Sequence, residues 1–207
     1  MDLNEFQNFA QLDTENMLEH IDALPEQLDA AYKLGLSMAL PATKPVERII
    51  VAGMGGSAIG ADLIAAYLAD QLPVPILVHR DYDLPAYAAG PQTFVVVSSH
   101  SGNTEEALSA YEAALERGCQ LLAICTGGRL EEVSRKAGIP VWKFDHAGQP
   151  RAAVGYSFGL LLAFLTRLKL IEDQTREVEN TRTVMTALQT RIRANVPVLQ
   201  NPAKRQA

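Results

Sequence analysis

The feature that most constrains the fold is a short apolar run that ends in a glycine-rich turn. Residues 49–52 are all apolar, and Gly53, Gly55 and Gly56 follow them directly or within a few positions. A strand that is apolar at every position is buried on both faces, which is typical of parallel sheets. Glycine permits positive φ or a close backbone approach, so the chain can turn sharply here. Ser57 then stands where a helix can begin, and free N–H groups at a helix N-terminus favour an anion.

Four more short apolar runs, each bounded by turn residues, predict further strands. Helical spacing of apolar residues between these runs predicts intervening helices. Strands that alternate with helices favour an α/β fold, here a three-layer αβα sandwich around a five-stranded parallel sheet with flavodoxin-like strand order. The five predicted strands are residues 49–52, 75–78, 93–97, 121–125 and 141–144.

We divide the chain into three parts. Residues 1–41 form an N-terminal helical segment, residues 42–170 form the α/β domain, and residues 171–207 form a C-terminal helical segment. A Leu-Pro break separates the two leading helices, and proline- or glycine-bearing stretches mark most other boundaries. The predicted helices are residues 2–19, 25–40, 57–72, 105–117, 130–136, 152–170 and 171–196.

Composition restricts the partners. The formal net charge is −6, and no basic stripe is present, so neither nucleic acid nor an anionic membrane surface is expected as a partner. We see no signal peptide and no apolar run of membrane-spanning length, so we expect a cytoplasmic protein. Cys119 and Cys125 lie in or beside an apolar run and are interpreted as buried hydrophobes in a reducing compartment, with a disulfide between them as the alternative.

A second polar turn follows the third predicted strand. Ser99, Ser101 and Thr104 place three hydroxyl groups ahead of a predicted helix. The oxygens of a phosphate ester each accept hydrogen bonds, so several hydroxyl and amide donors suit such a group. The alternative is a helix cap, because Asn103 with Glu106 three positions later resembles a capping box. A cap needs only one such residue, so we favour phosphate binding.

The glycine turn alone fits other interpretations. It could serve only to turn the strand into its helix. Gly53, Gly55 and Ala58 also satisfy a dinucleotide-binding fingerprint, with Asp81 after the second predicted strand. Asp81 lies roughly eight residues beyond the usual spacing of about twenty. A dinucleotide site has no need of the hydroxyl-rich second turn, so a nucleotide-binding oxidoreductase fragment is retained only as an alternative.

These motifs together resemble a known family. Gly53-Met-Gly-Gly-Ser-Ala and Ser99-x-Ser-Gly-Asn-Thr-Glu-Glu are similar to the sugar isomerase (SIS) domain. More narrowly, the first motif together with Gln149-Pro-Arg-Ala-Ala-x-Gly-Tyr156 resembles the bifunctional phosphoglucose/phosphomannose isomerase family. The resemblance extends over most of the chain, including Asn201-Pro-Ala-Lys204. It implies interconversion of glucose 6-phosphate and mannose 6-phosphate with fructose 6-phosphate, without a metal or other cofactor.

The resemblance also implies the site residues. The hydroxyl side chains would hold the 6-phosphate, and the glycine turn would line the sugar. Arg151 would lie beside the reacting C1 and C2 oxygens, where a fixed cation stabilises the developing charge of a cis-enediolate; a plain surface arginine is the alternative. The implied binding residues are Ser99, Ser101 and Thr104 for the phosphate and Gly55, Gly56 and Ser57 for the sugar.

One departure from the family matters. There, a glutamate in an Asn-Glu-Asn segment moves the proton between C1 and C2, and a histidine in a Pro-Glu-x-x-His-Asn segment is assigned to ring opening. Both belong to a second sugar isomerase half, and neither segment occurs in this sequence. We therefore expect the N-terminal half of such an enzyme, with residues 171–207 as a linker helix, binding hexose 6-phosphate with little or no turnover. A truncation, a deliberately expressed half and a natural short protein stay open.

Two further expectations concern histidines and partners. The four histidines show no metal-ligand spacing, so no metal site is predicted, and we place them in loops or on the surface. The flanking helices carry apolar faces that need covering, so we expect a homodimer or an exposed sticky patch. A non-catalytic, sugar-phosphate-binding regulatory module is the alternative function. The histidines are His20, His79, His100 and His146, of which only His100 is expected near the site.

Overall fold

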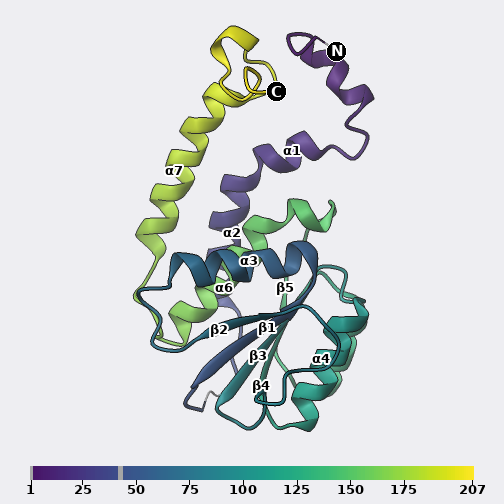
Figure 1. Ribbon diagram of the computed structural model, residues 1–207, viewed down its shortest axis with the longest axis vertical. Coiled ribbons are helices and arrows are strands. Elements are labelled where there is room, and N and C mark those ends of the chain that lie inside the picture. Colours follow the sequence, from purple (N-terminus) through teal and green to yellow (C-terminus); the bar gives the residue numbers. More distant parts are fainter. Residues whose placement is uncertain (1, 42–43) are drawn as a thin grey trace.

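A five-stranded sheet forms the centre of the protein in a computed structural model, which describes residues 2–41 and 44–207 (Figure 1). The strand order is β2-β1-β3-β4-β5, and every neighbouring pair is parallel. This order is that of the flavodoxin-like doubly wound sheet, so the predicted fold class is confirmed. The strands are β1 (Arg48–Gly53), β2 (Ile76–His79), β3 (Thr93–Ser99), β4 (Gln120–Cys125) and β5 (Val141–Lys143).

Helices cover both faces of this sheet and make the outer layers of the sandwich (Figure 1). Successive strand residues point to opposite faces. Phe94 and Val96 therefore join the apolar cluster under α2, α3 and α6, whereas Val95 and Val97 join the one under α4 and α5. The first layer comprises α2 (Leu24–Ser37), α3 (Gly55–Tyr67) and α6 (Val154–Arg167), and the second comprises α4 (Glu105–Glu116) and α5 (Gly128–Lys136).

The prediction of one helix over residues 2–19 is wrong. The chain instead forms a 3-10 helix, η1 (Phe6–Gln11), and a separate short helix, α1 (Met17–Asp22). Asn16 has a φ of 53°, which interrupts helical geometry between them. The Asp13 carboxylate accepts the N–H groups of Met17 and Leu18, so a new helix begins there. Apolar spacing alone could not show this local competition for backbone N–H groups.

The two chain ends lie near each other, beyond the far end of α7 (Thr175–Ile192), which extends away from the sheet (Figure 1). The Asn4 side chain accepts the N–H of Val198 at 3.0 Å, and Lys204 Nζ donates to the Leu3 carbonyl at 2.6 Å. Around this region several large apolar side chains are exposed. The most exposed are Leu199 (89%), Leu12 (72%) and Val184 (67%). None of the helices in the described part combines the length and apolar character that a membrane span needs.

At the start of α3, glycines allow the segment around Pro150 and helix α6 to pack closely against the helix. The helix begins at Gly55, whose φ is +47°, rather than at Ser57 as predicted. A Cβ on Gly56 would lie 2.4 Å from the carbonyl oxygen of Pro150, in the 3-10 helix η2 (Pro150–Ala152). A Cβ on Gly60 would likewise lie 2.4 Å from the Ser157 hydroxyl on α6. The glycine motif therefore brings the segment that carries Arg151 against the first turn of α3.

Candidate sugar-phosphate site

The backbone and side chain of His100 join four loops at the carboxyl ends of the strands. Its N–H donates to Ser57 Oγ at 3.0 Å, on the turn after β1. Its carbonyl accepts the N–H of Thr126 at 3.0 Å and the Thr126 hydroxyl at 2.7 Å, after β4. Its imidazole Nε2 lies 2.9 Å from Nδ1 of His146, after β5. The two predicted motifs therefore meet, since the glycine turn and the serine loop share a direct hydrogen bond.

The serine loop is compact and internally bonded. The hydroxyls of Ser99 and Thr104 lie 2.9 Å apart, and Ser99 Oγ also accepts the N–H of Gly102 at 3.1 Å. Ser99 is 1% exposed. Gly102 has a φ of +69°, and a Cβ there would lie 1.8 Å from the Gly127 carbonyl oxygen. The loop is thus held tightly against the turn that precedes α5.

The capping-box interpretation of Asn103 is wrong. The N-cap of α4 is Thr104, and no side chain caps this helix. Asn103 instead accepts the N–H of Arg129 with its Oδ1 at 3.0 Å, which ties the serine loop to α5. Ser101 is exposed and accepts the N–H of Asn103 at 3.2 Å. Of the three predicted phosphate ligands, Ser101 therefore faces solvent, Thr104 is half-buried and Ser99 supports the loop from below.

The N-termini of two helices face this group of residues. Both α3 and α4 begin directly behind the glycine turn and the serine loop, and a helix N-terminus carries partial positive charge and free N–H groups. Gly55 is exposed, with open space where a side chain would stand. A hollow of about 10 Å³ lies between Ser57, His100 and Phe144. That volume holds at most about one water molecule, so a sugar phosphate would lie across the loops rather than inside a cavity.

Arg151 is only partly brought into this arrangement. Its backbone N would lie 3.1 Å from a Cβ on Gly56, so the main chain borders the site. Its exposed side chain lines a separate groove of about 340 Å³ with Met17, His20 and Ile21 of α1. Within the described residues, its guanidinium makes no hydrogen bond or ion pair. Its placement beside the C1 and C2 oxygens of a substrate stays a prediction.

The expectation that His100 alone among the histidines lies near the serine loop is wrong. His20, His100 and His146 gather at the site, with ring centroids 5.0 Å apart for His20 and His146 and 5.1 Å apart for His100 and His146. A Cβ on Gly148 would lie 2.4 Å from His20 Nε2, so glycine is needed where two rings close on the backbone. No metal-binding group of three or more His, Cys, Asp or Glu occurs in residues 2–41 and 44–207.

Burial sets the electrostatics of the histidine pair. It lowers the pKa of His100, and it is also the main cause that lowers the pKa of His146, assisted by the charges of His100 and His20. Both rings are therefore neutral at neutral pH. A signal for this pair was present in the sequence, because His100 and His146 each follow a predicted strand closely. Carboxyl ends of parallel strands meet on one side of the sheet, so such residues come together.

The disulfide alternative is contradicted. Cys119 and Cys125 are both free thiols, separated by the length of β4. A strand rises about 3.3 Å per residue, so the two lie far beyond disulfide reach. Burial raises the pKa of the Cys125 thiol to about 11 and also raises that of Cys119. Neither thiol is activated as a nucleophile.

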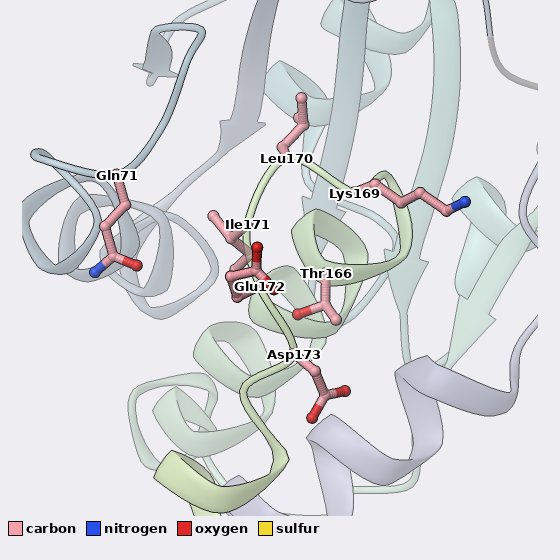
Figure 2. A pocket seen from close by; sticks show the side chains of 7 residues that line it. All are labelled: Gln71, Thr166, Lys169, Leu170, Ile171, Glu172 and Asp173. Carbon is pink, nitrogen blue, oxygen red and sulfur yellow. The ribbon is translucent and has the colours of Figure 1, made fainter.

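A larger pocket of about 640 Å³ lies away from the loops. Figure 2 shows it at the connection between α6 and α7, with Gln71 on one side and residues 166–173 on the other. It shares no residue with the loop site. No buried polar atom without a partner lines it among the described residues, so it lacks the marks of a built polar site.

Comparison with known proteins identifies the class. Residues 44–138 match the SIS domain. The chain is 42% identical to the bifunctional phosphoglucose/phosphomannose isomerase of Caldicellulosiruptor bescii over 91% of its own length and 56% of the relative's. It is 30% identical to the D-glucosamine-6-phosphate 4-epimerase of Sulfolobus acidocaldarius over 78% and 52% of the two chains. A crystal structure of a hypothetical protein from Thermus thermophilus superposes with a TM-score of 0.65 at 17% identity, covering 99% and 51%.

The fold and the two loops therefore define a protein of the SIS-domain class. The domain match and the architecture shared with the Thermus thermophilus structure agree with this assignment. The chain spans about half the length of the curated relatives it matches. Within the class, it belongs to the bifunctional phosphoglucose/phosphomannose isomerase family.

Proposed function

We propose that this chain binds a hexose 6-phosphate and belongs to an enzyme that converts glucose 6-phosphate and mannose 6-phosphate into fructose 6-phosphate through a cis-enediolate. The observation that carries the proposal is the hydrogen bond from His100 to Ser57, which joins two anion-accepting turns into one surface. The name of the Caldicellulosiruptor relative supports the substrate class. We further propose that the binding domain extends over residues 42–170, since α6 supplies much of the core, and that α2 of the N-terminal helical segment packs onto this core.

In the proposed complex, the phosphate lies over the serine loop. Ser101 is exposed and Thr104 half-buried, so their hydroxyls need little movement to donate, and the free N–H groups of α4 add to them. The sugar then extends towards Gly55 and Ser57 on the turn before α3. Ser99 contributes either by turning its hydroxyl outward or by supporting the loop.

Arg151 is the proposed electrophile. Its side chain is long, exposed and without an ion-pair partner in the described part of the chain, so it is free to turn from the α1 groove towards Gly56. A cation fixed beside C1 and C2 lowers the energy of the enediolate. The family's glutamate base and histidine segments are absent from this sequence, so we propose that the chain alone has little or no turnover.

Thermal unfolding with ligands tests the binding proposal. A ligand that binds the native state stabilises it by about 2.7 kcal/mol at a hundredfold excess over Kd. Fructose 6-phosphate should raise the unfolding temperature, whereas fructose, which lacks the phosphate, should not. NAD serves as the probe of the alternative dinucleotide site. Stabilisation by NAD and none by fructose 6-phosphate would favour a nucleotide-binding fragment instead.

A non-catalytic sugar-phosphate-binding regulatory module is the second candidate, because the bond between His100 and Ser57 joins the two anion-accepting turns without requiring a catalytic base. An isomerase assay on the purified chain can exclude the regulatory module, because a protein with robust turnover is an enzyme. Robust turnover would also contradict our expectation that this chain alone has little activity. We also propose that the protein is cytoplasmic. We propose in addition that it forms a homodimer, which the exposed apolar side chains of Leu12, Val184 and Leu199 support. Light scattering that gives a monomer mass would contradict the dimer.

A further inference from the structure

The histidine pair at the site contains one buried nitrogen with no partner. His146 Nδ1 lies 2.9 Å from His100 Nε2, so one proton of a neutral pair lies between these two atoms. His146 Nε2 is buried, and within residues 2–41 and 44–207 it has no hydrogen-bond partner. Whether His146 Nε2 carries a proton decides which of the two rings donates the hydrogen bond between them.

A buried N–H without an acceptor is rarer and less favourable than a buried acceptor without a donor. His146 Nε2 therefore carries no proton, and the proton of the neutral His146 ring is on Nδ1. His146 then donates to His100 Nε2. It follows that the neutral His100 ring carries its own proton on Nδ1.

His100 Nδ1 is available to a ligand. No hydrogen bond among the described residues uses this atom, and it is not one of the fully buried atoms without a partner, so it is at least partly exposed on a half-buried residue. His100 borders the hollow beside Ser57 and lies between Ser99 and Ser101 of the serine loop. Four backbone and side-chain hydrogen bonds hold the residue, so the N–H group is fixed in place before any ligand arrives.

The neighbouring groups are compatible with neutral rings. The ring of Phe144 packs edge-on against His100, and the ring of Tyr156 lies 5.9 Å from that of His146. The titratable groups that face the pair are Tyr156 on α6 and His20 on α1, and Asp145 directly precedes His146 in the chain. No carboxylate among the described residues accepts a hydrogen bond from either ring. Burial therefore dominates and disfavours a second proton on the pair.

We propose that His100 donates its Nδ1–H to an oxygen of the bound hexose 6-phosphate, and that His146 is a positioning residue that fixes the His100 tautomer. This inference rests on the proposed function of the site. A hydrogen bond to an anionic oxygen is among the stronger ones in proteins, so its loss should be measurable. The pair also links the serine loop to the segment that carries Arg151.

The experiment combines histidine NMR with ligand titration on the full chain. Nitrogen-15 shifts of the ligand-free protein report the tautomer of each ring, and we expect Nδ1–H on both His100 and His146. Fructose 6-phosphate is then titrated into the wild type, His146→Asn and His146→Leu. The asparagine amide can place an N–H near the position of Nδ1, whereas leucine cannot. We expect about 10-fold weaker binding for His146→Leu, and for His146→Asn binding within about threefold of wild type.

Each result decides the inference. A His100 ring that carries its proton on Nε2 overturns it, whatever the ligand does and whether or not the variants fold. Equal affinity in His146→Leu and wild type also overturns it and leaves the proposed function intact. If the wild type binds no fructose 6-phosphate, both proposals fail, and the ligand-free tautomers still show whether the pair itself is as described. Weakening by leucine with recovery by asparagine supports a donor role over a packing role.

Discussion

Ser57 Oγ accepts the backbone N–H of His100 at 3.0 Å, and this bond connects the turn after β1 to the loop after β3. The two segments lie 43 residues apart along the chain. Because β1 and β3 are neighbours in the sheet, their carboxyl ends place the two loops side by side. Ser57 is 9% exposed, so its hydroxyl serves the structure of the site as well as any ligand.

Ser57→Ala should lower the free energy of unfolding by about 1–3 kcal/mol, because it leaves the partly buried N–H of His100 without an acceptor. Chemical denaturation measures the change. Ser101→Ala is the matched control, since that hydroxyl is exposed and its loss should change stability by about 0.5 kcal/mol at most. Similar small losses in both variants would show that the bond does not hold the two loops together.

Ser101→Ala should nevertheless weaken the binding of fructose 6-phosphate by about 10-fold, because it removes an exposed donor to the phosphate. Isothermal titration calorimetry gives the affinity. Ser37→Ala, an exposed serine at the end of α2, is the control and should bind as the wild type does. Unchanged affinity in Ser101→Ala would remove this hydroxyl from the site.

Gly102→Ala should destabilise the protein more than Gly118→Ala, although both glycines have nearly the same φ, +69° and +66°. The shared backbone strain costs about 1–2 kcal/mol in each variant. At Gly102 the new Cβ would also lie 1.8 Å from a carbonyl oxygen, whereas Gly118 has nothing within 4 Å. The added clash should cost about 1–3 kcal/mol more in chemical denaturation. An equal loss of unfolding free energy in the two variants would mean that the serine loop can shift away from the Gly127 carbonyl at little energetic cost.

Stability should fall as the pH drops below about 6.5, the ordinary pKa of histidine. Burial lowers the pKa values of His100 and His146 in the folded state. At a pH between the folded-state pKa and the unfolded-state pKa, the unfolded chain therefore binds more protons than the folded protein. The stability that comes from keeping the two rings neutral is fully present above the unfolded-state pKa and is lost as the pH falls from the unfolded-state pKa to the folded-state pKa. Denaturation curves from pH 7.5 to 5 measure it. His146→Asn should flatten the profile, and an unchanged slope in that variant would contradict the assignment.

Thiol labelling should distinguish the two cysteines. The Cys125 thiol is buried with a pKa raised to about 11, so a disulfide-exchange reagent at pH 8 should leave it unmodified in the native protein. Cys119 is half-buried and should react slowly, and both should react once the chain is unfolded. Mass spectrometry of labelled peptides reads the outcome. An intramolecular disulfide after mild oxidation would contradict the separation along β4.

Much of the fold could be predicted because its strands are apolar runs with turn residues between them. The runs before Gly53 and Ser99 are buried on both faces, a pattern that depends little on distant context. The first residues were harder, because Asn16 and Asp13 decide locally where α1 begins. Helical spacing of apolar residues gives no information on that choice.

The site could be predicted in part. The glycine turn and serine loop were recognisable as anion-accepting turns, and the sheet brings them together through Ser57 and His100. The spacing of His100 and His146, 46 residues apart, does not show that they pair; the available signal was that each closely follows a predicted strand, and β3 and β5 end on the same side of the sheet. The direction of the Arg151 side chain depends on its packing beside α1, which the motif around it does not encode.

A structure of the chain with fructose 6-phosphate bound tests the central claim most directly. The phosphate should lie over residues 99–104, with the Ser101 hydroxyl and N–H groups of the α4 first turn as donors, and the sugar should extend towards Gly55. A phosphate bound elsewhere, for example in the pocket between α6 and α7, with the serine loop empty, would contradict it.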